Sequence, residues 1–155
     1  MSFAQIEILL VDDDPNDIDL MLRALKKGHL DGKVHVARDG EEALEYIFCR
    51  GAFADRKVEE VPRVIFLDLK LPKVNGIQVL DALKKDGRTR SIPVVVITSS
   101  REQRDVLEVY RLGVNSYVQK PIDSERFQAI VMEIGTYWLK VNVEPPPESF
   151  IGDGI

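Results

Sequence analysis

The sequence predicts an α/β fold, a doubly wound five-stranded parallel sheet with helices on both faces. Apolar runs rich in β-branched residues, such as Val64–Leu67 and Val94–Ile97, lack the apolar/polar alternation of a half-exposed strand. Such runs are typical of parallel strands that helices cover on both faces. Segments with apolar residues at helical spacing lie between them. Right-handed crossovers between these strands then place helices on both sides of the sheet.

Length, composition and charge limit the classes of function that the chain can have. The chain has 155 residues, 45% hydrophobic and 30% charged, which suits one soluble globular domain. Its net charge of −5 gives no basic face for nucleic acid. No apolar run is long enough for a membrane span, and the first residues lack the charged-then-apolar pattern expected of a leader peptide. The single cysteine, Cys49, excludes an internal disulfide and predicts a cytoplasmic protein.

The first βαβ unit begins with a strand at about Glu7–Val11. Asp14 offers an N-cap, and Pro15 suits the first helical position. Gly28 is expected to end this helix, and Val34–Ala37 forms the second strand. The helix carries its apolar residues at helical spacing, namely Ile18, Met21, Leu22 and Leu25.

The second helix is expected to start after Asp39, because Glu42 stands three residues on in a capping-box pattern. This helix is expected to end at Gly51, and Cys49 is expected to be a small core residue on it. The charged connection Ala52–Pro62 is of a length that is more often functional or mobile than structural. The inner face of the helix consists of Ala43, Leu44, Ile47 and Phe48.

The second half repeats the alternation. A third helix contains Ile77 and ends near Gly87, and a fourth covers about Arg101–Leu112. Tyr117 and Val118 form a short fifth strand. The fifth helix starts after Asp123 and carries an apolar stripe made of Phe127, Ile130, Val131, Ile134 and Trp138.

Two regions follow from this pattern: a domain at 1–140 and a tail at 141–155. Three consecutive prolines, Pro145–Pro147, cannot continue a helix and favour an extended stretch. A terminal segment of this kind is expected to fray. Phe150 and Ile151 nevertheless make the tail more apolar than an inert one needs to be.

Polar side chains follow four of the predicted strands. Asp12 and Asp13 follow the first, Asp68 the third, Thr98 the fourth and Lys120 the fifth. An open parallel sheet binds its ligands just beyond the carboxyl ends of its strands. Each residue taken alone is explained by an ordinary structural role, as a helix cap, a hydrogen-bonded hydroxyl or a surface charge. Their combination predicts one site that holds a divalent cation and accepts a phosphoryl group.

The expected chemistry is nucleophilic attack on phosphorus by the Asp68 carboxylate, which would form an acyl phosphate. Crowded carboxylates repel one another, and Mg2+, which prefers oxygen ligands, removes that conflict. Asp13 and Asp68 are the expected direct ligands, Asp12 acts through water, and the Lys70 carbonyl could add an oxygen. Asp14, by contrast, is expected to serve only as the N-cap.

The phosphoryl oxygens need partners as well. Thr98 can donate a hydrogen bond to one of them, and Lys120 can pair with another as a charged donor. Positioning and charge stabilisation of this kind are what phosphoryl transfer mainly requires.

This set resembles the receiver domain of two-component response regulators over about residues 5–140. The spacings agree, since Thr98 lies 30 and Lys120 lies 52 residues after Asp68. The matching residues are Asp12-Asp13, Asp68-Leu69-Lys70-Leu71-Pro72 with Gly76, Thr98-Ser99, Tyr117 and Lys120-Pro121.

The resemblance implies a flavodoxin-like receiver fold with strand order 2-1-3-4-5. It implies that a histidine kinase phosphorylates Asp68, that Mg2+ is required, and that Thr98 and Tyr117 relay the change. The protein would then catalyse its own phosphorylation and dephosphorylation and not be an enzyme with a separate substrate. It also implies a cis peptide at Lys120–Pro121.

Finer features resemble stand-alone receivers that are paired with phytochrome-type histidine kinases. These features are Leu71-Pro72-Lys73, the long 52–62 connection, and Tyr137-Trp138-Leu139 before the prolines. Output would pass to a target protein or by onward phosphotransfer. A homodimer is expected, built through the fourth and fifth helices or through the C-terminal extension, with Tyr137, Trp138, Phe150 and Ile151 as anchors.

Three other classes of protein fit the sequence less well. Haloacid-dehalogenase-like phosphatases need a second aspartate where Lys70 stands, and no general acid is placed for a leaving group. A pseudo-receiver, which acts purely as a binding module, would lack one of the acids, Thr98 or Lys120. A Rossmann domain needs a Gly-rich loop where Asp12-Asp13-Asp14 stands.

Overall fold

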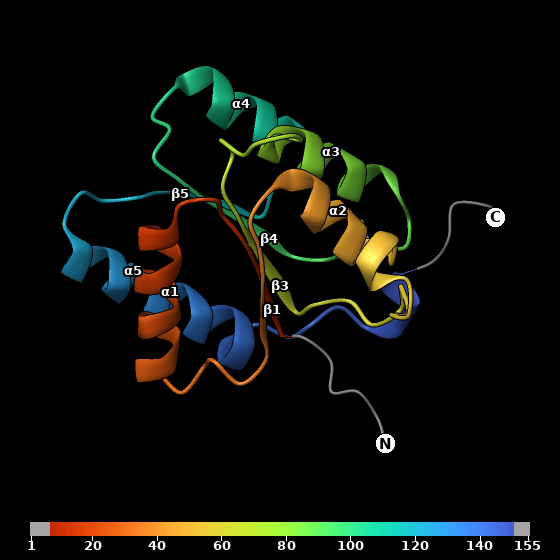
Figure 1. Ribbon diagram of the computed structural model, residues 1–155, viewed down its shortest axis with the longest axis horizontal. Coiled ribbons are helices and arrows are strands. Elements are labelled where there is room, and N and C mark those ends of the chain that lie inside the picture. The colour runs from red at the N-terminus through yellow and green to blue at the C-terminus, as the bar shows by residue number, and fades with distance from the viewer. Residues whose placement is uncertain (1–6, 151–155) are drawn as a thin grey trace.

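A five-stranded parallel sheet of order β2-β1-β3-β4-β5 forms the centre of the molecule, as predicted. The computed structural model describes residues 7–150. Neighbouring strands pair in parallel register throughout, and Figure 1 shows the twisted sheet between two layers of helices. The strands are β1 (Ile8–Val11), β2 (Val34–Ala37), β3 (Val64–Leu67), β4 (Val94–Thr98) and β5 (Ser116–Gln119).

Two apolar layers fill the space between sheet and helices. On one face α1 (Pro15–Lys27) and α5 (Ser124–Thr136) lie side by side; on the other lie α2 (Gly40–Ile47), α3 (Gly76–Lys85) and α4 (Gln103–Arg111) (Figure 1). Successive residues of a strand point to opposite faces. Ile8 and Leu10 therefore pack with α1 and α5, whereas Leu9 and Val11 pack with α2, α3 and α4. The two layers bury the central strands β1, β3 and β4 completely, which explains their unbroken apolar runs.

Side-chain caps fix the helix starts that border the functional edge. Asp14 Oδ1 accepts from the backbone N–H of Asn16 at 2.9 Å, which confirms the predicted N-cap of α1. Asp39 Oδ1 accepts from the N–H of Glu42 at 2.7 Å and starts α2. A full capping box between Asn75 and Gln78, which the sequence analysis did not identify, starts α3.

The connection after α2 departs from expectation. The α-helix ends at Ile47, before Gly51, and Cys49 has a φ of 56°, so this half-buried residue is not helical. A short 3-10 turn, η1 (Gly51–Phe53), follows. The connection is then anchored, because the Arg56 guanidinium lies 3.8 Å from the Tyr46 ring centroid and hydrogen-bonds to the Tyr46 carbonyl.

The C-terminal segment folds back on the domain instead of fraying over residues 142–150. After α5 a π-helical turn, η2 (Tyr137–Val141), closes with a hydrogen bond from Asn142 N–H to Tyr137 O at 2.7 Å. Past the prolines, η3 (Pro147–Ser149) leads to Phe150, which packs against the layer of α2, α3 and α4. Ser91 Oγ donates to Ser149 O at 3.2 Å. Ile151 lies outside the described residues.

None of the helices at 7–150 has the length and apolar character to cross a membrane.

Candidate functional site

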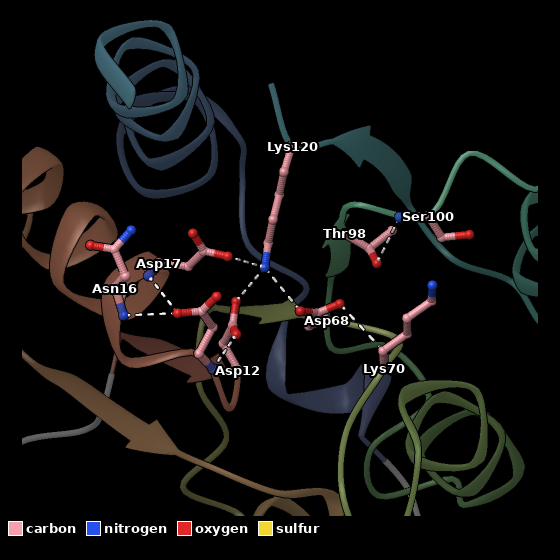
Figure 2. A network of polar contacts seen from close by, with 9 residues as sticks. Asp12, Asn16, Asp17, Asp68, Lys70, Thr98, Ser100 and Lys120 are labelled. Carbon is pink, nitrogen blue, oxygen red and sulfur yellow. Dashed lines mark hydrogen bonds and ion pairs between the residues drawn. The ribbon is translucent and has the colours of Figure 1, made fainter. Parts of the chain in front are cut away.

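The carboxyl ends of four strands meet at one edge of the sheet. Register pairs Val11 with Leu67 and Leu67 with Val96, so the residues that follow β1 and β3 emerge beside the end of β4. Asp12, Asp68, Thr98 and Lys120 are all buried at this edge. Figure 2 shows that Asp12, Asp68 and Lys120 point toward one another, while Thr98 lies at the end of its strand nearby.

Three carboxylates form an acid cluster, which comprises Asp12, Asp13 and Asp68. One oxygen from each lies within 4.8 Å of the others. Asp12 and Asp68 are buried, whereas Asp13 is exposed at the mouth of the site. Hard oxygen donors at this spacing suit a divalent cation such as Mg2+. The expected convergence of the three acids is therefore present.

The electrostatics of the cluster also fit a cation. Burial raises the pKa of Asp12 to about 6, although its hydrogen bond with Lys120 opposes the rise. The neighbouring Asp68 carboxylate adds to it. Asp12 is held in place because its Oδ1 accepts from the Asp14 N–H at 2.9 Å. The Lys120 ammonium therefore compensates the buried Asp12 carboxylate only in part, and a bound cation would supply further positive charge.

Lys120 is the second centre of the site. Its side chain is 7% exposed. Burial disfavours the charged ammonium, but its ion pairs more than compensate and raise the pKa of Lys120 above its ordinary value. The ammonium donates to three carboxylates at once: Asp12 Oδ2 at 2.8 Å, Asp17 Oδ2 at 2.8 Å and Asp68 Oδ2 at 2.9 Å (Figure 2).

The loop after β4 is tied to β5. The Ser100 N–H donates to Thr98 Oγ1 at 3.3 Å, and Ser100 Oγ donates to Asp105 Oδ2 at 2.6 Å. The Tyr117 hydroxyl donates to the Ser100 carbonyl at 3.0 Å, so this ring is already bound to the loop. Thr98, Ser100 and Tyr117 thus form one chain of contacts that leads from the site toward α4.

The loop after Asp68 rests on two glycines. A Cβ on Gly76 would lie 2.1 Å from the Asp68 carbonyl oxygen, and one on Gly40 would lie 1.8 Å from the Val74 carbonyl oxygen. The Gly40 N–H also donates to the Pro72 carbonyl at 3.4 Å. These close approaches hold the loop against the first turns of α2 and α3. Within it, the Lys70 N–H donates to Asp68 Oδ1 at 3.4 Å.

The structure brings together Asp12, Asp13, Asp68 and Lys120, which the sequence singled out, with one correction and two additions. No cis peptide occurs in residues 7–150, so the bond between Lys120 and Pro121 is trans. Asp17 and Ser100 belong to the site but were not identified. Asp17 could have been found, because it stands one helical turn before the buried Met21 and so faces the core.

Comparison with known proteins supports the same identification. Residues 8–132 match the response regulator receiver domain. The response regulator Rcp1 of Synechocystis sp. is 34% identical over 138 residues, which cover 89% of this chain and 92% of Rcp1.

Solved structures are similar as well. The Mn2+-bound form of Rcp1 has a TM-score of 0.84 and 33% identity, and covers 92% of this chain and 99% of that chain. The phosphorylated cyanobacterial phytochrome response regulator RcpA has a TM-score of 0.85 and 36% identity with the same coverage. The bacteriophytochrome response regulator RtBRR is 46% identical, with a TM-score of 0.72, and covers 93% of this chain and 86% of that chain.

Proposed function

Because this chain belongs to the response regulator receiver family, we propose that Asp68 is its phosphoacceptor and that Lys120 and Thr98 stabilise the transferred group. One observation carries the proposal. Lys120 lies 2.9 Å from Asp68 at an edge of the sheet where Asp12 and Asp13 also converge. A nucleophile, a charged donor and a cation site therefore surround the same point.

The proposed transfer starts from a histidine kinase bearing phosphohistidine. A carboxylate oxygen of Asp68 bonds to phosphorus as the bond from phosphorus to the donor nitrogen breaks, and that nitrogen keeps the electron pair. The Lys120 ammonium, which contacts Asp68 before the transfer, then donates that hydrogen bond to a phosphoryl oxygen instead. Thr98, buried at the end of the neighbouring strand, donates a hydrogen bond from its hydroxyl to another phosphoryl oxygen.

The cation we propose is Mg2+, held by Asp13 and Asp68 directly, by Asp12 through water, and by the Lys70 carbonyl. When bound, such an ion neutralises negative charge on the phosphoryl oxygens. The support for it is the acid cluster and the raised pKa of Asp12.

The proposed readout runs through Thr98 and Tyr117. When Thr98 turns toward the phosphoryl group, its contact with the Ser100 N–H is released. Tyr117 and Ser100 then shift together, because the Tyr117 hydroxyl is bonded to the Ser100 carbonyl. The surface of α4 and β5 changes shape, and this is the signal that a partner would recognise.

The proposed partners are a phytochrome-type histidine kinase, a downstream target or phosphotransfer protein, and a second copy of the chain. The kinase class is supported by similarity to Rcp1, RcpA and RtBRR. We propose a cytoplasmic location, which the single cysteine favours. We also propose that the protein modifies only itself and is not an enzyme with a separate substrate.

The deciding experiment is intact-mass measurement after incubation with acetyl phosphate and Mg2+. We expect one added phosphoryl group in the wild-type protein and none in Asp68→Asn or in the presence of a chelator. Asp14→Asn is the matched control, because asparagine caps a helix as well as aspartate does and should leave labelling intact. Undiminished labelling of Asp68→Asn would overturn the assignment.

A further inference from the structure

Asp17 lies on the first turn of α1, outside the acid cluster, yet it contacts the buried Lys120 ammonium at 2.8 Å. We propose that Asp17 is a positioning residue, which holds the Lys120 ammonium in place while the cation and the phosphoryl group engage Asp12 and Asp68. This inference rests on the proposed function, since it assigns Asp17 a part in the same transfer.

The ammonium has three N–H donors and three carboxylate partners, so its hydrogen bonding is saturated. The partners come from three elements: Asp12 follows β1, Asp17 is in α1 and Asp68 follows β3 (Figure 2). A lysine side chain is long and flexible, and a single contact would leave it several positions. Three contacts from separate directions fix the nitrogen at one point.

Two of the three partners are shared with the acid cluster. Asp12 and Asp68 are expected to face the cation together with Asp13, while Asp17 is not part of that group. A divalent cation and the Lys120 ammonium repel each other when they compete for the same two carboxylates. Asp17 is the carboxylate that remains with Lys120, and its charge offsets that repulsion.

The same logic applies after transfer. One N–H of Lys120 passes from Asp68 to a phosphoryl oxygen, and the contacts with Asp12 and Asp17 remain. If Asp17 is lost, a single carboxylate shared with the cation site holds the ammonium. The nitrogen then leaves the position from which it can stabilise the transferred group.

The placement of Asp17 is built into the helix. Asp14 caps the first turn through the N–H groups of Asn16 and Asp17, and this orients Asp17 toward the sheet edge. Its side chain is 22% exposed. Asp19, on the same helix, points outward: its side chain is 55% exposed and pairs with Arg23 at 3.0 Å. Asp19→Asn therefore removes the same charge from α1 without touching Lys120.

The first test measures the ammonium itself, with no phosphoryl donor present. Selective 15N NMR of the Lys120 Nζ group, with and without Mg2+, gives its hydrogen-exchange rate. We expect exchange to be about fivefold faster or more in Asp17→Asn, as for the loss of one charged hydrogen bond out of three. The increase should be larger with Mg2+, partly reversed in Asp17→Glu, and absent in Asp19→Asn. Equal exchange rates in Asp17→Asn and Asp19→Asn would overturn the proposal.

The second test is the rate of phosphorylation by acetyl phosphate and Mg2+, compared among variants with the same folded fraction by circular dichroism. Asp17→Asn should be slower by about three- to tenfold, and Asp17→Glu should recover part of the rate. A rate equal to or above that of Asp19→Asn would contradict the positioning role. If the wild-type protein takes up no phosphoryl group, the proposed function fails, and the NMR comparison still decides the position of Lys120.

Discussion

Asp12 shows at the scale of a residue what the burial of a carboxylate at the proposed cation site costs in stability. Only 1% of this residue is exposed, and burial is the largest cause of its raised pKa. A carboxyl whose pKa is higher in the folded than in the unfolded protein favours folding when it is protonated. An acid placed only for stability would have been exposed or fully paired.

The first prediction concerns the pH dependence of the metal-free protein. The contribution of Asp12 is fully present below the unfolded pKa near 3.8 and is lost as the pH rises through about 6. The loss should amount to about 1–3 kcal/mol in the free energy of unfolding at pH 7. Urea denaturation in a chelator at several pH values between 4.5 and 7.5 measures it.

Asp12→Asn provides the comparison. Its unfolding free energy should lack the decline near pH 6, while the contribution of the half-buried His35, whose pKa burial lowers, stays the same in both proteins. Mg2+ should stabilise the wild-type protein increasingly as the pH rises, because the ion binds the ionised carboxylate. Parallel pH curves for the two proteins would refute the assignment.

At the residue scale, the sequence predicted the acids and Thr98 because unmistakable apolar runs precede them. Lys120 was placed only by the short fifth strand before it. The sequence did not reveal Asp17, because a lone acid in a first turn is usually explained by the helix dipole. The family resemblance also implied a cis bond at Lys120–Pro121 that the structure lacks. Peptide isomers depend on tertiary contacts around the bond, which local sequence does not encode.

At the scale of elements, the loop after Asp68 is positioned by the helices that it touches. Gly40, at the start of α2, lies against the Val74 carbonyl, so α2 supports a loop that follows β3. The Asn75–Gln78 capping box fixes the other end of that loop at α3. The sequence predicted both helices but not this contact, because two segments far apart in the chain form it.

The second prediction is that Gly40→Ala displaces this loop. The new Cβ would lie 1.8 Å from a backbone oxygen, so the loop or the helix must move. We expect a loss of about 2–4 kcal/mol in the free energy of unfolding and slower phosphorylation of Asp68. Gly32→Ala is the control, because nothing lies within 4 Å of its added Cβ. Equal stability of the two variants would show that the loop yields at no cost.

At the scale of the whole molecule, the C-terminal segment contradicts the expectation of a frayed end over residues 142–150. Phe150 packs against one apolar layer and Trp138 against the other. Arg63 also pairs with Glu144 at 3.1 Å, although an ion pair this exposed adds little stability. Sequence periodicity could not show this docking, because the prolines interrupt any regular pattern. The division between 1–140 and 141–155 stays a prediction.

This packing bears on the proposed homodimer, because two of its expected anchors, Trp138 and Phe150, contact the core of their own chain. Apolar side chains that remain exposed lie on α4, where Leu107 is 50% and Tyr110 is 51% exposed. Tyr137 and Val141, in the η2 turn that follows α5, are 47% and 64% exposed. The helical face is therefore the better-supported of the two interfaces that the sequence left open.

The last prediction follows from that choice: the dimer should survive removal of residues 144–155 but not the loss of the apolar side chains of α4. Light scattering at several concentrations should give a dimer for the wild-type and truncated chains, and a monomer for Leu107→Ser combined with Tyr110→Ser. Val143→Ser, which alters an 89% exposed residue of the C-terminal segment, is the matched control and should remain dimeric.

Truncation should still lower the free energy of unfolding by about 1–3 kcal/mol, because the half-buried Phe150 leaves its apolar contacts. A truncated chain that becomes monomeric would move the interface to the tail. A full-length chain that stays monomeric at high concentration, phosphorylated or not, would end the dimer proposal.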